Sequence, residues 1–203
     1  MTPIIHQLWL GPMPDWIEWC IQSWRDVEPT AEHVLWTEST LRRELFPLAN
    51  QELWDNPPND RVAQFRSDVA RYEILNRVGG IWVDADFEAR KPVSGLDGAW
   101  ATWEIQDRWV ANGMLAVPAG HPVLADAINS LPGSYVRSHR HSNSRISGPR
   151  FFTPLALKHG LTIYPQAWFY PYAWADVPST ALELGKDWGD VYAVHHWHNR
   201  RQG

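Results

Sequence analysis

The first 90 residues alternate between apolar segments typical of strands and segments with the period of a helix. Residues 3–11 (PIIHQLWLG) are apolar and β-branched and run into a Gly-Pro pair, which is typical of a strand that ends in a loop. Apolar residues within 15–27 recur at helical spacing, and this segment stops before Pro29. Residues 33–37 (HVLWT) predict a second short strand, so the order begins as strand, helix, strand.

A long helix and a third strand are predicted next. The apolar residues of this helix recur at helical spacing: Phe65, Val69, Tyr72 and Leu75. The glycines at 79–80 are typical of a helix C-terminus, and residues 80–87 (GIWVDADF) predict the following strand. Strands that alternate with helices through short connections predict a parallel α/β core in this part of the chain.

The remaining segments mix further strands and helices. Strands are predicted over residues 99–104, 108–118, 161–165 and 191–197, and helices over 41–46, 121–131 and 151–160. Residues 134–150 hold four arginines, two histidines and few apolar residues, so we expect a surface loop there. Since no repeat or linker divides the chain, we expect one α/β domain over residues 1–203.

Composition places the chain among ordinary globular proteins. Its 203 residues are 44% hydrophobic and 20% charged, which allows one domain with a substantial core. A net charge of −5 gives no support for nucleic acid or an anionic membrane as the main partner. The single cysteine, Cys20, excludes an intrachain disulfide and cysteine-rich metal sites. No apolar run approaches about 18 residues and the first residues lack a signal-peptide pattern, so we expect a cytoplasmic protein.

Tryptophan is unusually frequent, with 14 residues spread from Trp9 to Trp197. One interpretation is core packing. The other is stacking, because flat rings suit sugar faces and nucleobases. A tryptophan-rich module that only binds carbohydrate would fit the second interpretation, but such modules are usually all-β, unlike the order of elements predicted here.

Two aspartates interrupt the apolar strand predicted over residues 80–87. Asp84 and Asp86 are two positions apart, so on a strand both side chains would project to the same side, roughly 6–7 Å apart. Ligands of open α/β sheets bind beyond the carboxyl ends of the strands. Two carboxylates there would repel each other, and Mg²⁺ or Mn²⁺, which prefers oxygen ligands, would neutralise them. The pair therefore indicates a divalent metal that neutralises a diphosphate leaving group.

Residues 65–92 (FRSDVARYEILNRVGGIWVDADFEARKP) closely resemble the signature of the DXD-containing glycosyltransferases of family 32. These include capsular-polysaccharide enzymes and share a core pattern with the large clostridial glucosylating toxins. Further elements of the family resemble IIHQLWLG (4–11), NGMLAVPAGHPVL (112–124), SGPRFFT (147–153) and HHW (195–197). The resemblance implies a GT-A fold, which is a Rossmann-like mixed sheet flanked by helices, with a nucleotide-sugar donor, a divalent metal and retention of anomeric configuration.

The resemblance also implies a role for individual residues. Trp9 matches the tryptophan that stacks on the donor base, and Asp68 with Arg71 matches the pair that holds the donor sugar hydroxyls. Asp84 matches the residue nearest ribose and phosphate, and Asp86 matches the direct ligand of Mn²⁺ or Mg²⁺. Further candidates for nucleotide-sugar binding are His6, Trp36, Ser67, Trp82 and Trp197, and further candidates for metal binding are His196 and His198. Residues 1–92 would hold the donor, and residues 93–203 would shape the acceptor side.

Some of these roles have alternatives. Asp68 and Arg71 are three positions apart on one helix, so a salt bridge within the helix is the alternative to sugar binding. The histidines near the end are metal or diphosphate contacts, or polar residues at a terminus: His195, His196 and His198. The family often continues its His-His-Trp into a Ser-Trp pair, whereas this chain continues into Asn-Arg-Arg, which makes Arg200 or Arg201 a candidate phosphate contact.

The predicted function is metal-dependent, retaining transfer of a hexose from a nucleotide diphosphate sugar, with UDP preferred, to a hydroxyl of a glycan, protein or lipid-linked acceptor. A catalytically degenerate chain that only binds carbohydrate or nucleotide sugar is one alternative. A phosphatase of the haloacid-dehalogenase type is another, but it carries its aspartates after the first strand. Glu104 and Asp107 lie in a plausible region for a further carboxylate, without support from a motif.

Overall fold

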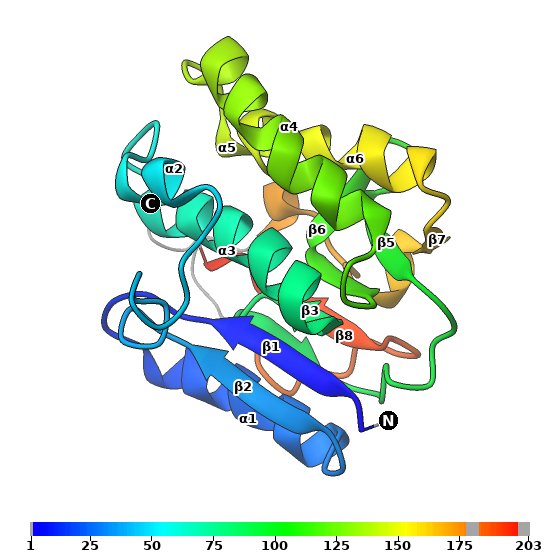
Figure 1. Ribbon diagram of the computed structural model, residues 1–203. Coiled ribbons are helices and arrows are strands. Elements are labelled where there is room, and N and C mark those ends of the chain that lie inside the picture. Colours follow the sequence, from blue (N-terminus) through cyan, green and yellow to red (C-terminus); the bar gives the residue numbers. More distant parts are fainter. Residues whose placement is uncertain (1, 178–182, 199–203) are drawn as a thin grey trace.

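A six-stranded mixed sheet forms the centre of the computed structural model, which describes residues 2–177 and 183–198 (Figure 1). The sheet has the strand order β2-β1-β3-β6-β5-β7, and a separate two-stranded sheet pairs β4 with β8. The strands are β1 (Ile4–Leu8), β2 (Glu32–Trp36), β3 (Gly80–Val83), β4 (Phe87–Ala89), β5 (Trp100–Ile105), β6 (Trp109–Val117), β7 (Thr162–Tyr164) and β8 (Ala193–His195).

Helices connect these strands and cover both faces of the sheet (Figure 1). The α-helices are α1 (Asp15–Val27), α2 (Gln51–Asp55), α3 (Val62–Val78), α4 (Pro122–Ser138), α5 (Asn143–Ile146) and α6 (Pro149–Lys158). Two short 3-10 helices follow, η1 (Gln166–Trp168) and η2 (Trp174–Asp176). The mixed sheet flanked by helices that the sequence predicts is therefore confirmed.

Strand directions change half-way across the sheet. β1 runs parallel to both β2 and β3, as the alternation of strands and helices in the first 90 residues predicts. β6 then runs antiparallel to β3 and to β5, while β7 is parallel to β5. The carboxyl end of β3 thus lies beside the middle of β6, where Asp84 N–H donates to the Gly113 carbonyl at 2.8 Å.

β3 is buried on both faces, as expected for a central strand of a covered sheet. Ile81 and Val83 belong to an apolar cluster that includes Trp24 of α1. Trp82, on the opposite face, belongs to the larger cluster formed with α3, α4 and α6. The alternation of side chains along one strand therefore joins the two layers of the core.

The two glycines between α3 and β3 are required by the backbone. Gly79 has φ 70° and Gly80 has φ 108°, both in the region that favours glycine. A Cβ atom on Gly79 would lie 2.5 Å from the backbone nitrogen of Ala119, and one on Gly80 would lie 2.6 Å from the carbonyl oxygen of Ile4. The chain can therefore leave the helix and enter the sheet directly, which places the end of β3 close to α3.

Two predicted elements differ from the structure. The helix predicted at 41–46 is a turn, in which Leu45 and Phe46 N–H groups donate to the Arg42 carbonyl, and the helix forms later, as α2. The surface loop predicted over residues 134–150 is largely helical, since α4 extends to Ser138 and α5 follows. Asn143 and Ile146 are buried in this segment, so it is not a solvated loop.

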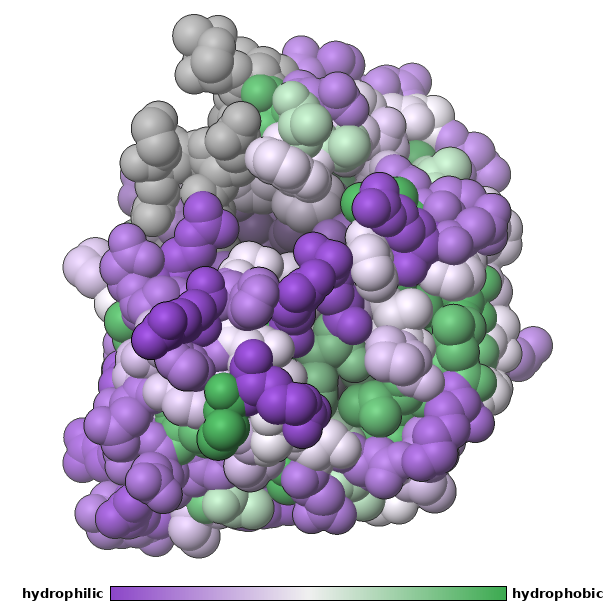
Figure 2. Space-filling view, turned by 90° about the horizontal axis from the view of Figure 1, so that it is seen from above, coloured by the Kyte–Doolittle hydropathy of each residue, from purple (hydrophilic) through white to green (hydrophobic). Residues whose placement is uncertain are grey.

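Figure 2 shows the molecule from above the view of Figure 1, and this face is mostly hydrophilic with scattered apolar groups. None of the helices in residues 2–177 and 183–198 has the length and apolar character needed to cross a bilayer.

Candidate active site

Asp84 and Asp86 lie in a tight turn that joins β3 to β4. β3 ends at Val83, and the Phe87 N–H donates back to the Asp84 carbonyl at 3.0 Å. The prediction that both aspartates lie on a strand was therefore wrong, because the chain turns at this point instead of remaining extended. The turn still leaves both carboxylates at the carboxyl end of β3, which is where the sequence predicts a ligand.

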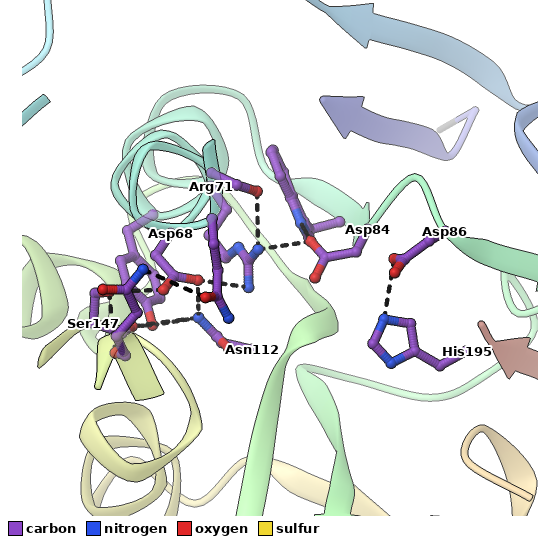
Figure 3. A network of polar contacts seen from close by, with 12 residues as sticks. Asp68, Arg71, Asp84, Asp86, Asn112, Ser147 and His195 are labelled. Carbon is purple, nitrogen blue, oxygen red and sulfur yellow. Dashed lines mark hydrogen bonds and ion pairs between the residues drawn. The ribbon is translucent and has the colours of Figure 1, made fainter. Parts of the chain in front are cut away.

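The chain end brings a histidine to this turn. β4 pairs antiparallel with β8, which sets Phe87 opposite His195. His195 Nε2 then lies 3.0 Å from Asp86 Oδ1 (Figure 3). The backbone N–H of His198 donates to Asp86 Oδ2 at 2.8 Å. Ligand atoms of Asp84, Asp86 and His195 all lie within 4.8 Å of one another.

A buried arginine of α3 holds the other aspartate of the turn. Arg71 Nη2 contacts Asp84 Oδ1 at 2.6 Å, and Arg71 Nη1 contacts Asp68 Oδ1 at 3.2 Å (Figure 3). Trp82 Nε1 donates to the same Asp84 oxygen at 2.8 Å, and the arginine carbon Cζ lies 5.3 Å from the centroid of the Trp82 ring. One guanidinium therefore links helix α3 to the turn after β3.

Asp68 lies in a network with residues far along the chain (Figure 3). Asn112 Nδ2 of β6 donates to Asp68 Oδ1 at 2.8 Å, and Ser147 Oγ donates to Asp68 Oδ2 at 2.7 Å. The Tyr72 hydroxyl donates to the Ser147 carbonyl at 2.7 Å, which fixes the segment between α5 and α6 against α3. The sugar-binding aspartate predicted from the sequence is therefore held on both oxygens.

These side chains open into one cavity of about 650 Å³. Its walls come from β1, α3, the turn after β3, β5, β6, the α5–α6 segment and the chain after η1. Eight of the residues predicted as site residues line it: Trp9, Ser67, Asp68, Arg71, Asp84, Asp86, Trp197 and His198.

Residues 14–110 match the family model described as a glycosyltransferase sugar-binding region containing a DXD motif. The Asp84-Ala-Asp86 turn supplies that motif within the matched stretch. This part of the chain is similar to the DXD-containing glycosyltransferase family, and the resemblance predicted from the sequence is confirmed. Since the matched residues end inside β6, Asn112 and His195 reach the site from outside that stretch.

Curated relatives within the family are similar at low identity. Inositol phosphoceramide mannosyltransferase 3 of Schizosaccharomyces pombe is 26% identical over 98% of this chain and 56% of its own length. Lactosylceramide 4-alpha-galactosyltransferase of Mus musculus is 27% identical over 83% of this chain and 52% of its own length. The chain therefore spans about half the length of the curated relatives it matches.

Solved glycosyltransferase structures share the fold. PaToxG glycosyltransferase superposes with a TM-score of 0.64 at 16% identity, over 78% of this chain and 70% of that chain. A glycosyltransferase involved in glycosylation of the major capsid of PBCV-1 superposes with a TM-score of 0.52 at 10% identity, over 98% and 97% of the two chains. The GT-A type of fold implied by the sequence is confirmed.

Three predicted donor-binding residues do not line the cavity. His6 is buried in β1, where Nε2 contacts the Gly79 carbonyl at 2.9 Å and Nδ1 accepts from Trp36 Nε1 at 3.2 Å. Trp82 is fully buried beneath Arg71 and acts on the site through its bond to Asp84. All three side chains lie behind the cavity wall, so this geometry favours a structural role for His6, Trp36 and Trp82 over direct contact with a donor.

The predicted metal ligand His196 also lies elsewhere. It is fully buried, its Nε2 contacts Glu88 Oε2 at 2.9 Å, and its Nδ1 lies 3.2 Å from the Tyr172 hydroxyl. Adjacent residues of an extended chain face opposite sides, so the His195 ring reaches the Asp86 carboxylate, whereas the His196 ring faces Glu88 and its backbone N–H donates to the Asp86 carbonyl at 2.9 Å. His198 lines the cavity with its ring edge-on to Trp9, at a centroid distance of 4.9 Å. The candidates Arg200 and Arg201 lie outside the described residues.

The two aspartates of the turn have different electrostatic environments. Burial raises the pKa of Asp84 to about 6, although Arg71 acts in the opposite direction. Burial also acts to raise the pKa of Asp86, but His195 and the His198 N–H outweigh it and hold that pKa below its ordinary value. Burial opposes charge on His195 as well, yet Asp86 raises the pKa of its imidazole. Asp86 and His195 therefore form a buried ion pair.

The donor atoms of Asp84, Asp86 and His195 fit a small divalent cation. Two carboxylates and one imidazole suit Mn²⁺, and the carboxylates suit Mg²⁺. His195 Nδ1 is buried and has no hydrogen-bond partner among residues 2–177 and 183–198, so one ring nitrogen is not used by the described protein atoms. Binding of a cation requires the neutral imidazole and would release the proton that the ion pair holds.

Sequence reasoning missed three residues of the site. Asn112 and Ser147 reach Asp68 from 44 and 79 positions away, and no local pattern gives that distance. Both lie in segments that resemble the family, NGMLAVPAGHPVL and SGPRFFT, so the resemblance located them without giving their role. Tyr170 follows η1 in an aromatic segment, and only the lining of the cavity identifies it.

Proposed function

We propose that this chain is a metal-dependent glycosyltransferase that moves a hexose from a nucleotide diphosphate sugar to a hydroxyl group. The observation that carries the proposal is the meeting of two groups in one cavity: the Asp84, Asp86 and His195 donor atoms, and the Asp68 and Arg71 pair. A bound Mn²⁺ or Mg²⁺ would supply positive charge to the departing diphosphate. Retention of configuration is part of the proposal, and it follows from the resemblance to family 32.

The protein side chains have separate roles in this proposal. Asp68, fixed by Asn112 and Ser147, accepts hydrogen bonds from donor sugar hydroxyls and orients the anomeric carbon. Arg71 holds Asp84 in place through the contact of its Nη2 with Asp84 Oδ1 at 2.6 Å. The salt bridge between Asp68 and Arg71, which the sequence left as an alternative to sugar binding, is compatible with that role, because Arg71 acts against the rise in the pKa of Asp68 that burial causes.

The base and the sugar are proposed from likeness. Trp9 and Trp197 line the cavity, and we assign Trp9 to stacking on the nucleobase. The resemblance of Trp9, Asp68 and Arg71 to uridine-using members favours UDP over GDP. The names of the curated relatives specify transfer of mannose or galactose, which supports a hexose.

The acceptor is proposed from the same relatives. Their names specify inositol phosphoceramide and lactosylceramide, both linked to ceramide, so we propose a lipid-linked head group ahead of a free glycan or a protein. Residues 1–92 would hold the donor and residues 93–203 would shape the acceptor side, within one domain. A cytoplasmic location stays a prediction.

Incubation with a panel of UDP-sugars and GDP-sugars and Mn²⁺, followed by mass spectrometry, tests the proposal. We expect slow hydrolysis of one UDP-hexose, and loss of this hydrolysis in the Asp86→Asn variant and in chelator. Tight nucleotide binding without hydrolysis of any sugar would favour the alternative of a degenerate chain that only binds. Full hydrolysis in chelator without added metal would contradict metal dependence.

A further inference from the structure

Glu104 lines the cavity without a protein partner. It lies near the end of β5, is half-buried, and belongs to the cavity wall together with Asn112, Gly113 and Tyr170. Its carboxylate has no hydrogen bond and no ion pair with any residue of 2–177 or 183–198. Glu104 is therefore a carboxylate in the cavity whose lone pairs remain available to a ligand.

Buried glutamates with a structural task in this protein are bound differently. Glu28 accepts from the Val93 and Ser94 backbone N–H groups and from the Ser94 hydroxyl. Glu73 accepts from two backbone N–H groups, and Glu88 contacts both Arg90 and His196. Each of these carboxylates is satisfied by the fold, so Glu104 does not belong to that structural class.

Glu104 shares the wall of one cavity with both parts of the site. Besides burial, the charges of His195 and Arg71 act to lower the pKa of Glu104, and those of Asp84 and Asp68 act to raise it. Burial and then Glu104 raise the pKa of Tyr170. Burial raises the pKa of Glu104 to about 7, despite His195. A carboxylate of this kind is partly ionised at neutral pH and can accept a proton there.

We propose that Glu104 binds the hydroxyl of the incoming acceptor and takes up its proton as the glycosidic bond forms. The inference rests on the proposed function. In this step the acceptor oxygen bonds to the anomeric carbon, the bond from that carbon to the diphosphate breaks, and its electron pair leaves with the diphosphate. The acceptor proton passes to the Glu104 carboxylate. In a retaining transfer the acceptor enters on the diphosphate side of the sugar, so the proposal assigns Glu104 to that side of the cavity that it shares with Asp84 and His195.

Hydrolysis of the donor tests the proposal without an identified acceptor, because water is then the incoming hydroxyl. The probe is the nucleotide sugar that the wild-type protein hydrolyses, and the variants are Glu104→Gln and Asp107→Asn. Gln keeps the shape of the side chain but does not take up a proton. Asp107 is an exposed neighbour in the turn after β5 and does not line the cavity, which makes it the matched control.

We expect Glu104→Gln to lower the hydrolysis rate on the order of 100-fold, with UDP affinity in Mn²⁺ and melting temperature unchanged. Asp107→Asn should behave as wild type. A Glu104→Gln variant that hydrolyses at the wild-type rate would overturn the proposal. A loss of UDP affinity as large as the loss of rate would overturn it too, since Glu104 would then act in donor binding.

Azide separates proton acceptance from general electrostatic support. Azide is an anion with no proton to give up, so it should restore turnover to Glu104→Ala and form a glycosyl azide detectable by mass spectrometry. Absence of this product, with UDP affinity retained, would contradict the proposal. If the wild-type protein hydrolyses no nucleotide sugar at all, the failure lies in the proposed function and is recognised before any variant is made.

Discussion

Arg71 is the residue on which the geometry of the site depends most directly. Its guanidinium contacts Asp68, Asp84 and the Ser67 hydroxyl and lies against the Trp82 ring, so it joins α3 to the turn after β3. Burial acts against its charge, yet Asp84 and Asp68 together raise its pKa. The sequence could predict Asp68 and Arg71 as a pair by their spacing, but not the third partner, because Asp84 enters through a turn and not along a strand.

Gly113 sets how close the sheet can approach Asp84. A Cβ atom at this position would lie 2.7 Å from Asp84 Oδ2, which no side chain tolerates without displacement. We expect Gly113→Ala to move the carboxylate and to weaken Mn²⁺-dependent UDP binding by about tenfold or more, as for other groups that orient metal ligands. Isothermal titration calorimetry measures this effect.

Gly95→Ala is the matched control for this substitution. A Cβ atom on Gly95 meets nothing within 4 Å, and its backbone is not in the positive-φ region. This variant should bind UDP as the wild type does. Equal affinities for Gly113→Ala and Gly95→Ala would show that the position of Asp84 does not limit donor binding.

Trp9 tests the assignment of the base-binding surface. It is half-buried at the cavity, and its indole N–H donates to the Pro12 carbonyl at 3.0 Å. Stacking on a base contributes roughly 1–3 kcal/mol, so Trp9→Ala should weaken UDP binding about 5- to 150-fold with a near-normal melting temperature. Trp19→Ala, at an exposed position on α1, is the control. A large fall in melting temperature with retained affinity would mean that Trp9 is a core residue.

At the scale of elements, the sequence correctly predicted those helices and strands whose bounds depend on neighbouring residues. Helix α1 has the predicted bounds, Asp15–Val27, because its apolar stripe and Pro29 are both local features. The 134–150 segment was mispredicted as a loop because its burial depends on distant partners. The Ser147 hydroxyl donates to Asp68, and Asn143 Nδ2 donates to the Arg61 carbonyl at 3.1 Å. The polar side chains of this segment therefore form hydrogen bonds with α3 and the residue before it.

His6 couples strand β1 to the end of α3 and should make stability depend on pH. Burial lowers the pKa of His6 in the folded chain below the ordinary value of 6.5. A proton on Nδ1 would also face the indole N–H of Trp36, which that nitrogen now accepts. The unfolded chain therefore binds more protons as the pH falls below 6.5, so the free energy of unfolding should be greatest above 6.5 and should decrease toward the lower folded pKa.

Urea unfolding at about pH 7.5 and about pH 5.5 measures this contribution when wild type is compared with His6→Gln. The decrease in the free energy of unfolding between the two pH values should be smaller in the variant, because the group that takes up the proton is gone. His139→Gln, at an exposed position, should leave the wild-type decrease unchanged. An equal decrease in wild type and His6→Gln would assign the acid sensitivity to other histidines.

At the scale of the whole molecule, the site is assembled from segments that are distant in sequence. Residues near 68, 84, 112, 147 and 195 meet because β6 runs antiparallel beside β3 and because β8 returns to pair with β4. Parallel strands alone, which the first 90 residues predict, would not bring His195 to Asp86. The second small sheet therefore brings together the three side chains proposed to bind the metal, and this pairing was not predictable from periodicity.

Metal dependence of nucleotide binding tests the central claim most directly. Calorimetric titration of UDP into the wild-type protein should give an affinity at least about tenfold higher with Mn²⁺ than with chelator, which corresponds to about 1.4 kcal/mol. Asp86→Asn should bind UDP with the same, lower affinity in both conditions, while its far-ultraviolet circular dichroism stays that of the wild type. Equal UDP affinity with Mn²⁺ and with chelator in the wild-type protein would contradict a donor site built on Asp84, Asp86 and His195.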